Sequence, residues 1–207
     1  MDRHAHHRVA GDRAGDRPTA VQRAGARWGL DRVLLVHGPQ AEDDRDLARA
    51  LQRRLRHLPV VMLDDRLLPG ALLLEHMAVG PGGVTVVAGA AELIEPLQVE
   101  CLRGMFGAHA VLLRDGTAAD RTALVAPVRE RVAVIRRLID DYAPVLGALC
   151  LTGEGGPERL RALEVEGVLV AGPKAVAELA AREGDLRDYE LASMVDLLDR
   201  VCPPVLG

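Results

Sequence analysis

The chain has 207 residues, of which 49% are apolar and 27% are charged, and its formal net charge is −4. These values are typical of one globular domain with a sizeable core, and they argue against a surface that attracts nucleic acid everywhere, although a local basic groove stays possible. No stretch approaches the roughly 20 successive apolar residues of a membrane span, so we expect no membrane partner. The three cysteines are far apart and lack C-x-x-C spacing, which favours buried thiols over a zinc site or a disulfide framework.

The first 29 residues mix Gly, Pro, Arg and Asp with few apolar side chains. We therefore expect a disordered leader over residues 1–29, followed by one domain over residues 30–207. Met1 to Gly15 lack the apolar segment of a secretory signal, so we expect a cytoplasmic protein. Three histidines of the leader could chelate a metal, but its composition favours a solvated tail. They are His4, His6 and His7.

The first regular pattern is helical. Leu30 to His37 could begin either a strand or a helix, whereas Ala41 to His57 predicts an amphipathic helix with leucines at every fourth position. Its other faces carry arginines, which fit a solvated surface better than a phosphate-binding one. These arginines are Arg45, Arg49, Arg53, Arg54 and Arg56.

Three short apolar segments then predict a β-meander. They are Val60 to Leu63, Leu72 to Val79 and Val84 to Val87. The last two are joined by Gly80-Pro81-Gly82-Gly83, whose residues suit a tight turn, so we predict an antiparallel hairpin. A phosphate-binding loop is the alternative, but no Gly-Lys-Ser/Thr follows these glycines.

The second half alternates strands and helices. Ala110 to Leu113 predicts a strand, and Ala118 to Tyr142 predicts a helix that Pro127 should kink or divide. Two buried strands, connected through a loop around Gly153 to Gly156, and two closing helices complete the pattern. They span Val145 to Leu151, Val168 to Val170, Pro173 to Arg182 and Tyr189 to Val201.

Leu74 to Val87, with its V-G-P-G-G core, resembles the signature of the nuclease-related (NERD) domain family. Ala143 to Leu151, Val165 to Lys174 and Cys202-Pro203-Pro204 resemble later segments of that family, so the likeness covers roughly Gln40 to Pro204. It implies an α/β fold of the restriction-endonuclease-like type, with a central mixed β-sheet flanked by helices. In such nucleases carboxylates hold Mg²⁺, and a lysine stands beside the attacking water.

Carried over residue by residue, the resemblance places the family's first-helix acid nearest Asp44 and its strand aspartate on Glu75. These two are the candidate catalytic and metal-binding remnants. The family's Asp/Glu-x-Lys motif falls on Ala88-Gly89-Ala90, which offers neither an oxygen ligand nor a cation. The resemblance also aligns Pro127 with a glutamine that many members carry.

A rebuilt active site is the alternative, because catalytic groups of this fold can move to neighbouring elements. The replacement groups we weigh are Glu92 and Glu95 as acids, and Lys174, Arg103 and Arg114 as cations. His76 lies beside Glu75, but successive side chains of a strand point to opposite faces, so we expect it to be packed or hydrogen-bonded.

The sequence thus favours a pseudonuclease that acts as a binding or scaffold module, with nucleic acid or a protein as partner and no expected cofactor. The alternative is an active Mg²⁺-dependent DNA nuclease with relocated catalytic residues. A third possibility is a subunit of a larger complex.

Overall fold

A computed structural model of the chain describes residues 40–90, 97–104, 107–114, 117–120, 122–152 and 162–205, with side chains from Arg45 onward except those of residues 97–122. Six strands form one mixed sheet in the order β1-β2-β3-β7-β9-β8. Neighbours β1, β2 and β3 are antiparallel, β3, β7 and β9 are parallel, and β8 returns antiparallel to β9. The strands are Val61–Leu68 (β1), Leu72–Gly80 (β2), Gly83–Ala90 (β3), Val145–Leu151 (β7), Leu163–Val165 (β8) and Val168–Ala171 (β9).

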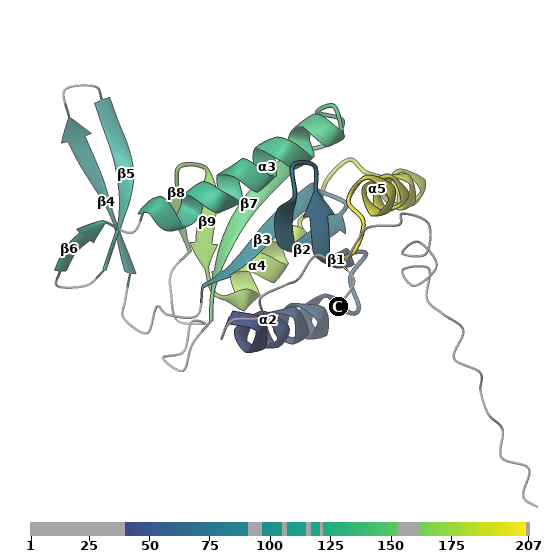
Figure 1. Cartoon of the computed structure of the whole chain (residues 1–207), viewed down its shortest axis with the longest axis horizontal. Helices are drawn as coiled ribbons and strands as arrows, with labels where there is room; N and C mark the ends of the chain where they lie inside the picture. The colour runs from purple at the N-terminus through teal and green to yellow at the C-terminus, as the bar shows by residue number, and fades with distance from the viewer. Residues whose placement is uncertain are drawn as a thin grey trace, which may run out of the picture.

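Helices cover both faces of this sheet (Figure 1). Helices α2 (Gln40–Leu55) and α4 (Pro173–Ala180) pack on one face, and α3 (Ala126–Leu138) and α5 (Asp188–Val201) pack on the other. The arrangement confirms the expected α/β class, a mixed sheet flanked by helices.

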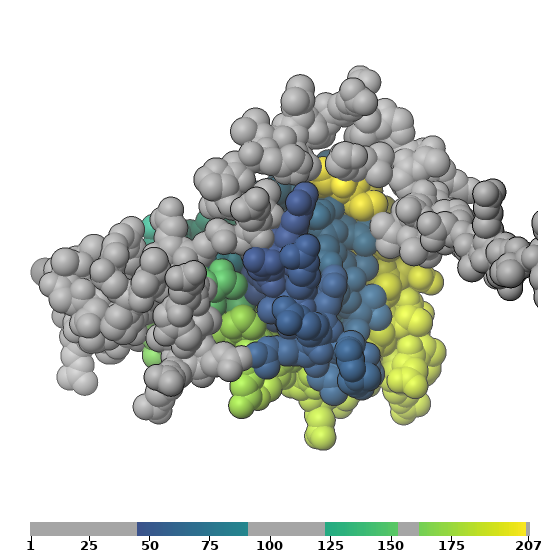
Figure 2. Space-filling view, turned by 90° about the horizontal axis from the view of Figure 1, so that it is seen from below, coloured from purple at the N-terminus to yellow at the C-terminus, as the bar shows by residue number. Residues whose placement is uncertain are grey.

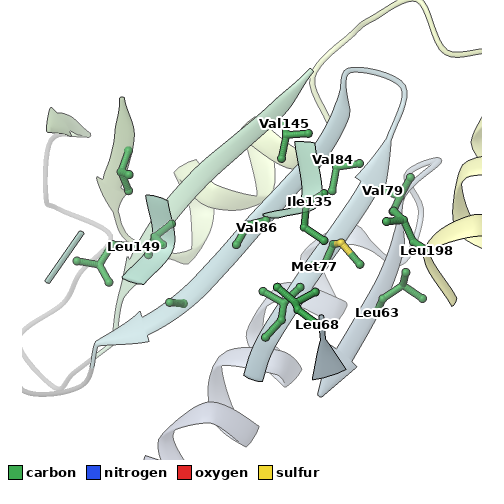
Figure 3. Packing of buried hydrophobic residues seen from close by; sticks show 14 of the residues in the cluster. Leu63, Leu68, Met77, Val79, Val84, Val86, Ile135, Val145, Leu149 and Leu198 are labelled. Atoms are coloured by element: carbon green, nitrogen blue, oxygen red, sulfur yellow. The ribbon is translucent and has the colours of Figure 1, made fainter. Parts of the chain in front are cut away.

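The larger apolar cluster lies under α3 and α5, where Ile135 and Leu198 pack over Met77 and Val84 (Figure 3). The smaller cluster joins the leucines of α2 to α4 on the opposite face. Since both faces of the central strands are covered, β3 needs apolar side chains at successive positions, not alternate ones. This explains why Val84, Val86 and Val87 are all buried, together with the polar Thr85 between them.

The predicted hairpin is present: β2 and β3 pair antiparallel and the register closes at Gly80 and Gly83. Gly83 has φ +114°, and a Cβ there would lie 2.2 Å from the carbonyl oxygen of Pro144. At Gly82 a Cβ would meet the side chain of Arg182 at 2.4 Å. The glycines of the turn are therefore needed for close packing as well as for backbone conformation.

A second, three-stranded sheet lies between β3 and α3 in the chain and beyond β8 and β9 in space (Figure 1). Its strands β4 (Leu97–Gly104), β5 (Gly107–Arg114) and β6 (Thr117–Asp120) are antiparallel neighbours. The strand predicted at Ala110 to Leu113 is thus confirmed within a longer one.

The helix predicted over Ala118 to Tyr142 is wrong in its first part. Strand β6 and a 3₁₀ turn, η2 (Thr122–Val125), precede α3, which begins only at Ala126. Pro127 lies in the first turn of α3, where a backbone N–H has no helical partner to lose. The proline therefore starts the helix and neither kinks nor divides it.

Residues 203–205 add a short extension to the outer edge of β1. The Leu67 amide donates to the Pro203 carbonyl at 2.9 Å, and the Val205 amide donates to the Asp65 carbonyl at 2.7 Å. Beside them Arg66, only 2% exposed, donates to the carboxylate of Asp199 on α5 at 2.6 Å. One buried guanidinium thus ties β1 to α5.

The other predicted strands and helices match described elements within a few residues. The predicted leader (residues 1–29), the segment from Leu30 to His37 and the loop around Gly153 to Gly156 lie outside the described residues. Among the helices that can be described, none combines the length and apolarity needed to cross a membrane.

Candidate functional site

The candidate site lies where β2 and β3 separate. Their pairing runs from the turn to His76 opposite Val87, and beyond this point β3 continues beside β7. The Gly89 amide donates instead to Oε2 of Glu75 at 3.1 Å. The carboxylate therefore satisfies a backbone donor that has lost its neighbouring strand.

The second partner of Glu75 is Arg131, from α3. Its guanidinium nitrogen Nη2 lies 3.6 Å from Oε1 of Glu75, while Nε donates to the Leu73 carbonyl at 2.6 Å. The Arg131 and Glu75 side chains are 12% and 23% exposed. An arginine held at two points on β2 thus balances the charge of the candidate carboxylate.

Ala88 and Ala90 line the same end of β3. Both pack with the larger apolar cluster, and their backbone partners on β7 are Leu149 and Leu151. Their methyl groups can neither ligate a cation nor hold a water for attack. Among the described contacts, Glu75 thus has the Gly89 amide and the Arg131 guanidinium as partners, next to the apolar Ala88 and Ala90.

Asp44 lies in the N-terminal part of α2, and its side chain is outside the described set. Helix α2 packs on the face of the sheet opposite α3, which supplies Arg131 to Glu75. The structure does not bring the two sequence-predicted acids into a described contact.

His76 is buried and hydrogen-bonded, as its place on the strand suggested. Its Nδ1 lies 2.9 Å from Oδ1 of Asp64 on β1. Gln52 of α2 donates to the other oxygen of Asp64 at 3.1 Å. The histidine therefore belongs to a polar contact on the α2 side, whereas Glu75 is engaged on the α3 side.

Only some of the residues weighed for a rebuilt active site are described by the structure. Lys174 is exposed in the first turn of α4. Arg103 and Arg114 lie on β4 and β5, with side chains outside the described set, and Glu92 and Glu95 are outside the described residues. Within the described ranges, no group of three His, Cys, Asp or Glu side chains could hold a metal ion.

The residues around Glu75 do not fit the Mg²⁺ site that the family resemblance implies. Mg²⁺ needs oxygen ligands in near-octahedral geometry, and within the described part of the chain this end of the hairpin offers the carboxylate of Glu75, which an arginine and a backbone amide already engage. A guanidinium beside that carboxylate would also repel a divalent cation.

Arg131 was not among the residues singled out from the sequence. It lies four positions after Pro127, on the same side of α3, and Pro127 is where the family likeness places a polar residue. The four-residue spacing from Pro127 could have pointed to Arg131. Arginine is so abundant in this chain that the spacing did not distinguish this residue from the others.

Comparison with known proteins adds no relative: the chain matches no family model, and neither a curated protein nor a solved structure is detectably similar to it.

Proposed function

We propose that this chain is a catalytically degenerate nuclease-related domain of the restriction-endonuclease-like type, which binds nucleic acid without cleaving it. One observation carries the proposal: Glu75 is engaged by Arg131 and the Gly89 amide, in a setting completed by Ala88 and Ala90. Phosphodiester hydrolysis in such folds needs a metal between carboxylates and a cation beside the water.

Arg131 supports loss of the reaction and not its relocation to this residue. A guanidinium stays protonated at any physiological pH, so it cannot accept the proton of an attacking water. It can neutralise Glu75, which removes the cost of keeping an uncompensated carboxylate in a partly buried place. The pair therefore stabilises a site that no longer recruits a metal.

The exposed face of α2 supports nucleic acid as the partner. Arg45, Arg49 and Arg53 follow one another at four-residue spacing, about 6 Å apart along the axis, and Arg56 continues the row. Figure 2 shows α2 at the surface of this face. The first turns of α2 are acidic, but from Arg49 to His57 there are four arginines and no acid, whereas the whole chain is net negative. Arginines on a helix more often mark a solvated face, and we propose phosphate binding here because this positive row is local and exposed.

Cleavage is tested first, on DNA and RNA with Mg²⁺ and with Mn²⁺. We expect no divalent-dependent cleavage by the chain, and loss of a well-placed catalytic charge typically costs a hundredfold or more in rate. The matched variant carries Ala88→Asp, Ala90→Lys and Arg131→Gln, which restores the acid and the lysine and removes the competing guanidinium. Cleavage by the unmodified chain that Glu75→Ala abolishes would overturn the proposal in favour of an active nuclease.

Binding is tested separately, by fluorescence anisotropy of labelled DNA and RNA at several salt concentrations. Replacing Arg49, Arg53 and Arg56 by Gln should weaken binding and reduce the slope of log affinity against log salt by about one per arginine. The matched control replaces Arg129, Arg137 and Arg200 by Gln, three exposed arginines with comparable surface contacts. Equal losses in both variants would remove α2 from the proposal, and no binding by the unmodified chain would refute nucleic acid as the partner.

A further inference from the structure

The two tyrosines of this chain are placed in an unusual way. The sequence has two tyrosines, one tryptophan and one phenylalanine. Both tyrosines are largely exposed, Tyr142 by 60% and Tyr189 by 63%, although each ring could contribute substantially to a core. Both also interact with the same carboxylate, Glu190, so they belong to one surface.

Tyr142 is held in place by this carboxylate. Its hydroxyl donates to Oε1 of Glu190 at 3.1 Å, and the Arg187 amide donates to Oε2 at 2.9 Å. These bonds lower the pKa of Glu190, the Arg187 amide contributing most and the Tyr142 hydroxyl next. A ring fixed in this way loses little conformational freedom when a partner binds.

Tyr142 forms one wall of a pocket of about 310 Å³ between the β2–β3 turn and the loop that joins α4 to α5. Pro81 and Pro144 contribute apolar walls. Two hydrogen bonds hold the turn and the loop together. The Leu186 amide donates to the Pro81 carbonyl at 3.2 Å, and the Arg182 guanidinium donates to the Gly82 carbonyl at 3.1 Å.

The charged groups of the pocket favour a cation. Glu183 and Asp185 line it, and Glu190 accepts a hydrogen bond from the hydroxyl of Tyr142. The lining cation, Arg182, already donates to a backbone carbonyl. An aromatic ring combined with carboxylates attracts a guanidinium or ammonium group, which the ring face and the negative charges stabilise together.

We propose that this pocket receives an arginine or lysine side chain of a protein partner, between the ring of Tyr142 and the carboxylates of Glu183 and Asp185. Tyr189 lies outside the pocket lining and extends the contact surface, as expected for a protein partner more than for a free amine. The pocket is at the turn end of the hairpin, away from Glu75, and its role does not depend on nucleic-acid binding.

The test uses the ¹⁵N-labelled chain and three capped tripeptides, Gly-Arg-Gly, Gly-Lys-Gly and the neutral isostere Gly-citrulline-Gly. The cationic peptides should cause saturable chemical-shift changes at the Gly82, Gly184 and Leu186 amides, and the citrulline peptide should bind at least about threefold more weakly. Tyr142→Ala should weaken binding by about threefold or more, whereas Tyr142→Phe, which keeps the ring, should retain most of it.

The role of charge is tested with the double variant Glu183→Gln, Asp185→Asn. It should weaken binding of the cationic peptides about fivefold and leave binding of the citrulline peptide unchanged. The unaltered amide spectrum of the remaining residues verifies that each variant is folded. Equal binding of all three peptides, shifts confined to another surface, or full binding by Tyr142→Ala would each overturn the proposal.

Discussion

The two ends of the β2–β3 hairpin differ in the contacts that constrain their residues. At the turn, Gly82 and Gly83 allow the backbone to approach Arg182 and Pro144 more closely than any side chain permits. At the open end, Glu75 contacts Arg131 and Gly89 beside two alanines. The V-G-P-G-G turn is therefore constrained by packing, whereas the candidate site lies some 20 Å away along β3. The sequence of the turn thus reports on packing and carries no information about the residues at the other end.

The largest loss of stability is expected from a substitution in the turn. Gly83→Ala should destabilise the domain by about 3 kcal/mol or more, because the new Cβ meets the Pro144 oxygen and the left-handed φ is unfavourable. Gly70→Ala is the matched control, since Gly70 has φ +85° with nothing within 4 Å of a Cβ. Urea unfolding of both variants measures the difference, and equal losses would mean that conformation alone, not packing, requires the glycine.

The next largest effect concerns Arg66, the buried guanidinium that joins β1 to α5. Asp199→Ala should cost about 3 kcal/mol, because it leaves a buried guanidinium without its carboxylate. Asp196→Ala, on the same helix, should change stability by less than about 0.5 kcal/mol, since its side chain is exposed. If thermal unfolding gives the same midpoint for both variants, Arg66 does not depend on this ion pair.

A smaller effect is expected at Glu75, whose ion pair is partly exposed. Glu75→Ala should destabilise by about 1 kcal/mol, because the Gly89 amide and Arg131 both lose an acceptor. Glu75→Gln should cost less, as its amide oxygen can still accept from Gly89. An increase in stability for Glu75→Ala would instead mean that the carboxylate is kept at an energetic cost, as working active sites often are. Chemical denaturation measures whether Glu75→Ala lowers or raises the free energy of unfolding.

The smallest effect at neutral pH concerns the thiols. Burial raises the pKa of Cys150 to about 12 and that of Cys202 to about 11, from an ordinary thiol pKa of 9.0. The folded state therefore holds these protons more tightly than the unfolded state, and the contribution to stability is complete below pH 9 and lost as pH rises toward 11 and 12. Above pH 9 the free energy of unfolding should fall by about 1.4 kcal/mol per pH unit for each thiol.

Unfolding measured at pH 8, 9.5 and 10.5 tests this dependence. The double variant Cys150→Ala, Cys202→Ala should show a flatter profile above pH 9 than the unmodified chain. An unchanged slope would mean that other groups cause any loss of stability at high pH.

Much of the fold could be predicted because it rests on local patterns. Leucines at every fourth position predicted α2, and the apolar segments on either side of Gly80 to Gly83 predicted the hairpin. Strands β4, β6 and β8 were not predicted, because β6 and β8 are short and β4 has little alternation. The start of α3 was misplaced because the helical spacing of apolar residues was extended back over Ala118 to Val125.

The candidate site was harder to predict, because its contacts join residues distant in the sequence. That Ala88 and Ala90 stand where the resembling family carries an acid and a lysine could be predicted from the sequence motif alone. The pairing of Glu75 with Arg131 depends on how α3 crosses β2, 56 positions further along. Nor could the surface position of Tyr142 and Tyr189 be read from a composition so poor in aromatic residues.

The backbone pairing of residues 203–205 with β1 has a consequence for biosynthesis. These residues leave the ribosome after every strand of the sheet, so the hydrogen bonds that they make to the outer edge of β1 form only after those strands have been made. An unpaired strand edge can pair with another chain, and this segment covers part of the edge. A nascent chain interrupted before Pro203 should therefore aggregate more readily than one that includes residues 203–205.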